Sequence, residues 1–117
     1  MDEAAIEDLF AAFGPVRCKR MFGGIGIYAD GLMFGLFAFD QIYLKADADF
    51  AHRLEGEGSR PFQYEARGRS IKLGYWTLPD SAVDDPDAAA DFARQALRIA
   101  RAAAAAKPPK KPKTPKN

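Results

Sequence analysis

The amino-acid sequence predicts an α+β domain in which helices pack against an antiparallel sheet of five strands. Apolar residues recur at helical spacing near both ends of the chain and alternate, as in strands, through the middle. Turn residues divide the middle into segments of strand length. The chain has 117 residues, of which 48% are hydrophobic, which is enough for one core. We expect this domain to occupy residues 1–104.

The first helix is expected over residues 3–13. Its apolar residues fall on one stripe, at Ile6, Leu9, Phe10 and Phe13. Acidic residues crowd its first turns, where the helix dipole favours negative charge. Gly14 and Pro15 are expected to end it, because glycine accepts the left-handed conformation and proline cannot continue a helix.

Three strands are expected next, within residues 16–28, 32–39 and 42–45. The first is interrupted by three glycines, which we interpret as a bulge, a sharp bend or a place of close backbone packing. Asp30–Gly31 predicts a two-residue hairpin turn, because both central positions of the favoured turn need a positive φ. A second turn is expected at Asp40–Gln41.

The strand over residues 32–39 is apolar on both faces. Simple alternation places four of its residues on one face and three on the other: Met33, Gly35, Phe37 and Phe39, against Phe34, Leu36 and Ala38. Such a strand is typical of the centre of a sheet, where the fold covers both faces or a partner covers one of them.

A short helix over residues 48–54 and a second hairpin with strands at 62–66 and 70–78 follow. A long helix begins near Pro86, whose fixed φ suits a first turn, with Asp84 or Asp85 as its cap. The predicted element order is therefore α-β-β-β-α-β-β-α.

The net charge of +1 conceals an uneven distribution. Residues 107–117 carry five lysines and no acid, so this segment has a charge of +5 and the preceding residues −4. Prolines keep such a sequence extended and solvated, and we expect residues 105–117 to form a disordered tail. Its lysines offer weak, salt-sensitive contacts to nucleic acid, or serve only solubility: Lys107, Lys110, Lys111, Lys113 and Lys116.

The acidic, amphipathic N-terminus is not typical of a signal peptide, and no apolar run reaches the length of a membrane span. A single cysteine excludes an intrachain disulfide and fits a reducing compartment. We therefore expect a cytoplasmic protein without a membrane partner.

Candidate catalytic residues are few. The glycines near Met21 lie between extended segments and not before a helix, which disfavours a phosphate loop. His52 is the single histidine, and Cys18 is expected to be a small, partly buried side chain on the face opposite Arg17 and Lys19. No nucleophile, base and orienting group stand together in the sequence, so neither catalysis nor a metal or other cofactor is predicted.

Basic residues of the first strand and the last hairpin, close to aromatic ones, present a second candidate contact to nucleic acid: Arg17, Lys19, Arg20, Arg67, Arg69 and Lys72. The alternative is that they are solvated charges that discourage pairing between sheet edges. We favour this alternative for the strand residues.

A series of short motifs resembles the N-terminal domain of the TfoX (Sxy) family. It comprises Arg20-Met21-Phe22-Gly23-Gly24 with Gly26, Ile27 and Tyr28, then Asp30-Gly31, Met33-Phe34, Tyr43-Leu44-Lys45, Tyr75-Trp76 and Leu78-Pro79. These blocks occur in order between about residues 5 and 100.

The resemblance implies a compact α+β fold like that of type III secretion chaperones. Full-length members of the family are bacterial competence regulators with a second, helical domain, so the present sequence resembles a stand-alone first domain. The resemblance offers no catalytic residues. It implies a regulatory or protein-interaction module with an unknown protein partner, or a homodimer, and we keep a nucleic-acid-associated protein as the alternative.

Overall fold

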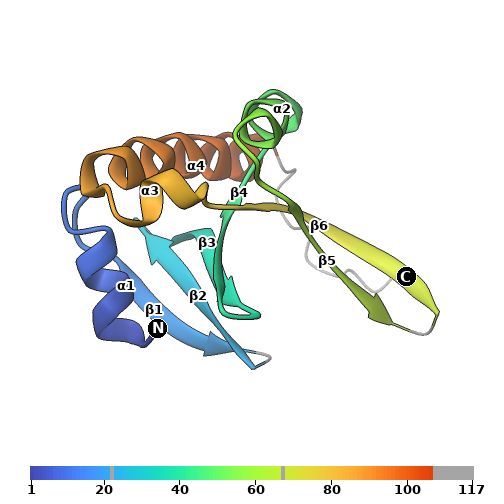
Figure 1. Ribbon diagram of the computed structural model, residues 1–117, viewed down its shortest axis with the longest axis horizontal. Helices are drawn as coiled ribbons and strands as arrows, with labels where there is room; N and C mark the ends of the chain where they lie inside the picture. Colours follow the sequence, from blue (N-terminus) through green and yellow to red (C-terminus); the bar gives the residue numbers. More distant parts are fainter. Residues whose placement is uncertain (22, 67, 107–117) are drawn as a thin grey trace, which may run out of the picture.

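The computed structural model describes residues 1–21, 23–66 and 68–106. It is an α+β fold in which one antiparallel sheet carries helices against one of its faces (Figure 1). Residues 107–117 of the predicted tail, together with Phe22 and Arg67, lie outside the described residues. Residues 105 and 106, which were expected to begin the tail, instead form the last two residues of helix α4 (Pro86–Ala106), because alanine has a high helix propensity. The sheet has the strand order β1-β2-β3-β4-β6-β5. Its elements are α1 (Glu3–Leu9), β1 (Arg17–Met21), β2 (Gly24–Ala29), β3 (Leu32–Ala38), β4 (Gln41–Lys45), α2 (Ala48–Gly56), β5 (Pro61–Ala66), β6 (Arg69–Thr77), α3 (Asp80–Val83) and α4 (Pro86–Ala106).

The sheet contains six strands, not the five predicted. The segment expected to be one interrupted strand over residues 16–28 folds back on itself as the β1–β2 hairpin, in which Met21 pairs with Gly24. Gly23 has a φ of 79° in the turn, a conformation that residues with a Cβ seldom adopt. The chain therefore reverses direction at these glycines. The sequence pattern had predicted only a local interruption within one strand.

The β2–β3 turn confirms the prediction, with φ values of 53° at Asp30 and 77° at Gly31. The β3–β4 turn is displaced by one residue from the predicted Asp40–Gln41. Ala38 pairs with Gln41, so the two turn residues are Phe39 and Asp40, with φ values of 50° and 61°. A bulky aromatic residue thus occupies a turn position that usually holds asparagine or glycine.

A register shift between β2 and β3, at Ile27 and Tyr28, changes the alternation of β3. For this reason, the predicted assignment of β3 residues to the two faces of the sheet was wrong. Phe34 and Phe37 pack with the residues under the helices, whereas Met33, Leu36 and Ala38 belong to a cluster on the opposite face. A bulge adds one residue to one strand and so reverses the facing of every residue beyond it.

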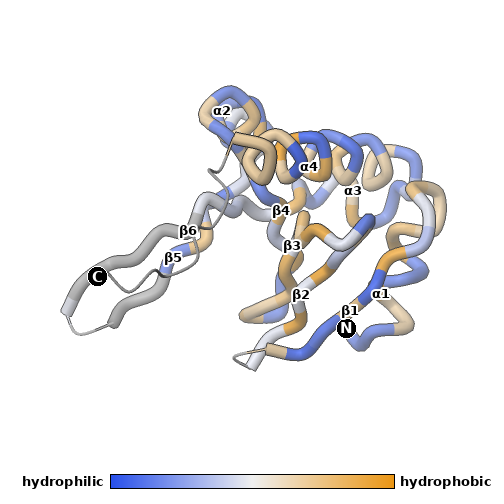
Figure 2. The backbone as a smooth tube through the Cα atoms, turned by 180° about the vertical axis from the view of Figure 1, so that it is seen from behind, coloured by the Kyte–Doolittle hydropathy of each residue, from blue (hydrophilic) through white to orange (hydrophobic). Residues whose placement is uncertain are grey.

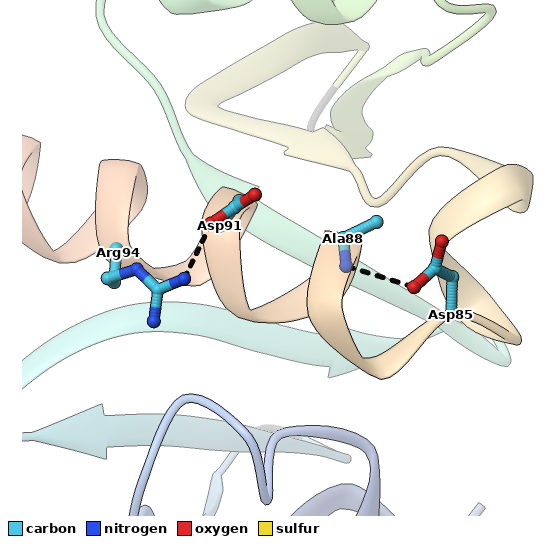
Figure 3. A network of polar contacts seen from close by, with 4 residues as sticks. All are labelled: Asp85, Ala88, Asp91 and Arg94. Atoms are coloured by element: carbon cyan, nitrogen blue, oxygen red, sulfur yellow. Dashed lines mark hydrogen bonds and ion pairs between the residues drawn. The ribbon is translucent and has the colours of Figure 1, made fainter.

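Aspartates begin three of the helices. Asp2 accepts a hydrogen bond from the Ala5 N–H (2.9 Å), and Asp47 accepts one from the Phe50 N–H (2.9 Å). Asp85 is the cap of α4, accepting from the Ala88 N–H at 3.2 Å (Figure 3). One turn further on, Asp91 and Arg94 form an ion pair across the exposed surface of the same helix.

The helices differ from their predicted extents at the ends. Helix α1 stops at Leu9, with Phe10 as its C-cap, four residues before the predicted end at residue 13. Helix α2 extends to Gly56, two residues beyond the predicted end. The one-turn helix α3, which begins directly after the buried Pro79, was not predicted.

The main core lies between the helices and the sheet. Every buried residue of α1, α2 and α3 belongs to it, together with side chains of α4 and of the strands beneath. Figure 2 shows hydrophobic stretches along β2 and β3 below α4, whose own colour alternates between hydrophobic and hydrophilic. Helix α4 covers this sheet face with small alanines, with the buried side chains of Phe92 and Leu97, and with the partly buried Ile99. Within the described residues, no helix is both long and apolar enough to cross a membrane.

Candidate interaction surface

Two glycines of the motif lie where another backbone or side chain comes close. A Cβ on Gly24 would stand 2.5 Å from the carbonyl oxygen of Phe37, nearer than real Cβ atoms approach. A Cβ on Gly26 would meet the ends of the Met21, Tyr28 and Met33 side chains at 2.8–3.1 Å. Both glycines lie against neighbouring strands, so they serve close packing within the sheet. A phosphate loop does not require this arrangement.

The later residues of the motif series lie on β4, on β6 and in the segment that follows β6. The Lys45 ammonium lies 5.4 Å from the centre of the Tyr75 ring, a cation–π contact across the β4–β6 ladder. Burial, and to a smaller extent Tyr28, raises the pKa of Tyr75 to about 12. Trp76 packs against the main core, and Pro79 is fully buried.

A second apolar cluster lies on the sheet face that the helices leave uncovered. We call it the helix-free face; its residues are Met33, Leu36, Ala38, Tyr43, Phe62 and Tyr75. The Tyr43 and Phe62 rings meet edge to face, 4.9 Å apart. All of these residues come from strands, and none of the described helices contributes a side chain to the cluster.

Phe39 borders the helix-free face at the β3–β4 turn. Its ring stacks on Phe62, with centroids 5.8 Å apart and planes 26° from parallel, yet 68% of the residue is exposed. A left-handed backbone costs a residue with a Cβ about 1–2 kcal/mol. An exposed aromatic side chain in a strained turn is therefore a candidate contact residue, because neither burial nor backbone preference explains it.

The basic residues predicted from sequence do not converge on one surface. Arg17, Lys19 and Arg20 are exposed on β1, at one edge of the sheet. Arg69 begins β6, next to the opposite edge. Arg20 also lies 3.9 Å from Glu3 of α1, so part of its charge is offset. The remaining predicted contacts, Arg67 and the tail lysines, fall outside the described residues.

Cys18 and His52 lie on different elements, β1 and α2. Cys18 is partly buried on β1 and packs against the main core, as its alternation with Arg17 and Lys19 predicted. Burial raises the pKa of its thiol, and the carboxylates of Glu3 and Glu7 raise it further. His52 is exposed on α2. Among the described residues, no three His, Cys, Asp or Glu side chains are grouped as metal ligands.

A comparison with protein families matches residues 8–100 to the TfoX N-terminal domain. The chain belongs to the TfoX N-terminal domain family. The family supports a regulatory or interaction role for this chain at the level of the domain. A search of curated proteins gives no match.

The part of the chain that matches the TfoX N-terminal domain begins inside α1 and covers all six strands. The helix-free face and Phe39 therefore lie within it, and the Lys-rich tail lies outside it. Sequence reasoning singled out the strand over residues 32–39 as apolar on both faces, which was the available signal for this surface. It did not identify Phe39, because the turn position and the bulge depend on pairing between strands.

Proposed function

We propose that this TfoX N-terminal domain is a non-enzymatic regulatory module that binds another protein through its helix-free face. The observation that carries the proposal is the second apolar cluster, which lies outside the helix-covered core and ends in the exposed ring of Phe39. Tyr43, Phe62 and Tyr75 are already buried in this cluster, so the exposed ring of Phe39 is the side chain that would contact the partner. An aromatic ring suits this role because it buries a large area and loses little conformational entropy.

The position of Phe39 supports this role. A two-residue turn of this kind accepts Asn or Gly more readily than Phe, so the aromatic ring is held at a cost to the fold. Its stacking on Phe62 joins the exposed ring to the buried cluster behind it. A partner that covers Phe39 would therefore extend an apolar surface that is already ordered.

Phe39→Asn is the first test, because asparagine tolerates the left-handed conformation. We expect the free energy of unfolding to change by no more than about 1 kcal/mol, since relief of backbone strain offsets the lost stacking. We expect the wild type to capture specific proteins from a native lysate, or to self-associate in light scattering, and we expect the variant to lose most of that binding. Arg98→Ala, an exposed substitution on α4, is the matched control. Retention of the same self-association and partners by Phe39→Asn would contradict the proposed surface.

A nucleic-acid-associated role is the second candidate, and the exposed cations of β1 favour it. Arg17 and Lys19 form no ion pair with any described residue, whereas Arg20 lies 3.9 Å from Glu3. Two such cations on an edge strand could contact adjacent phosphates of a duplex, although they equally discourage strand pairing.

Fluorescence anisotropy with a short DNA duplex tests this role at about 50 and about 200 mM salt. If β1 contacts phosphates, the paired substitution Arg17→Ala and Lys19→Ala should weaken binding and reduce the salt slope by about 1.8. Arg94→Ala with Arg98→Ala on α4 removes the same charge elsewhere. Equal loss in both pairs, or no binding at the lower salt concentration, would rule out a β1 contact. A variant with the five tail lysines replaced by glutamine separates the contribution of the tail.

A further inference from the structure

A groove with an acidic rim opens at the end of the molecule where α1 and α3 approach the β3–β4 turn. We call it the α1–α3 groove. It includes a hollow of about 330 Å³ with apolar walls formed by Met1, Leu9, Phe37, Ile42, Leu78 and Val83. A second hollow of about 570 Å³ shares Met1 and Phe37 with it and continues toward the β1–β2 turn. The two hollows adjoin at Met1 and Phe37.

Exposed apolar side chains gather at this groove. Three large hydrophobic residues are exposed among the described residues, and two of them, Met1 (49%) and Val83 (42%), line it. Val83 ends the one-turn helix α3, which follows the buried Pro79. These two residues and the apolar walls offer a contact surface for an apolar side chain of another molecule.

The rim carries four carboxylates and two cationic groups. Asp40 and Asp80 stand at the first hollow, and no lysine or arginine among the described residues lines it. Asp2 and Glu3 stand at the second hollow, where the basic groups are Arg20, 3.9 Å from Glu3, and the α-amino group of Met1. The two carboxylates and two cationic groups of the second hollow balance, so the excess of negative charge lies at Asp40 and Asp80, where it favours a cationic partner.

We propose that the α1–α3 groove binds a segment of a partner protein in which apolar side chains are flanked by lysine or arginine. Apolar walls beside carboxylates match a peptide segment that carries both apolar and cationic side chains. Apolar side chains would occupy the hollow between Leu9, Phe37 and Val83, and cationic groups would approach Asp40 and Asp80. This surface is distinct from the helix-free face, so the proposal stands independently of the function proposed above.

The test uses the full chain and a labelled peptide, Lys-Lys-Leu-Lys-Leu-Lys-Lys, in fluorescence anisotropy at low salt. Two comparison peptides replace the leucines by serine or the lysines by glutamate. We expect the parent peptide to bind more tightly than either comparison peptide. We expect Asp40→Asn with Asp80→Asn to weaken its binding about three- to tenfold, as for two exposed ion pairs. Asparagine suits position 40 because it accepts the positive φ found there.

Asp84→Asn with Asp87→Asn is the matched control, because it removes two exposed carboxylates near α3 that do not line the groove. Val83→Ser should weaken binding several-fold without reducing the salt dependence. Equal loss in the two aspartate pairs, or equal binding of the serine peptide, would show general electrostatic attraction and overturn the proposal. Failure of the parent peptide to bind at low salt would overturn it as well.

Discussion

Phe34→Ala should lower the free energy of unfolding by about 3–5 kcal/mol, the usual cost of emptying the site of a buried phenylalanine. Phe34 has no exposed surface and lies at the centre of an aromatic group. Its ring centroid is 5.6 Å from that of Phe10 and 5.2 Å from that of Phe13. The residues that follow α1 are held against the sheet by these contacts. Urea denaturation followed by circular dichroism measures the loss.

Phe39→Ala provides the control, because it removes the same atoms from the turn that follows β3. With 68% of Phe39 exposed, we expect a loss of about 1 kcal/mol or less, mainly from its stacking on Phe62. Similar losses for the two variants would show that the bulge does not direct Phe34 into the core as described.

Gly24→Ala should destabilise the fold by about 2–3 kcal/mol, because the added methyl has no room. Its Cβ would lie 2.5 Å from the Phe37 carbonyl oxygen and 3.4 Å from the Ala38 Cβ. The oxygen belongs to the backbone of β3, a central strand, and cannot rotate away as a side chain can. Relief would require the β1–β2 hairpin to move from β3, and denaturant titration would detect this loss.

Gly56→Ala is the corresponding control at the last residue of α2. No atom lies within 4 Å of a Cβ built there, and its backbone is helical. Alanine has the higher helix propensity, so we expect this variant to gain about 0.5–1 kcal/mol. If Gly24→Ala proved as harmless as Gly56→Ala, the motif glycines would not be needed for close packing.

Much of the fold could be predicted because its signals are local. The stripe from Ile6 to Phe13 indicated α1, the Asp30–Gly31 pair identified a hairpin turn, and the aspartate before Pro86 marked the start of α4. Each depends on the conformational preferences of a few adjacent residues. The extra strand was missed because glycines in a reversal and glycines in a bulge produce the same break in alternation.

The candidate surfaces were harder to predict because they depend on distant pairing. The facing of Leu36 and Phe37 is set by a register shift between β2 and β3, and the exposure of Phe39 follows from the pairing of Ala38 with Gln41. The α1–α3 groove brings together Leu9, Phe37 and Val83 from three remote segments. None of these relations has a period or motif of its own in the sequence.

The sequence by itself determined the α+β class, the element order apart from one hairpin and one short helix, and the family resemblance that the comparison confirmed. Tertiary structure alone decided which apolar residues lie under the helices and which lie on the opposite face of the sheet. The physical reason is that a strand has two faces, and only pairing with its neighbours establishes which face each side chain occupies. In this chain one bulge made that choice for β3, placing Phe34 under the helices and Leu36 on the helix-free face.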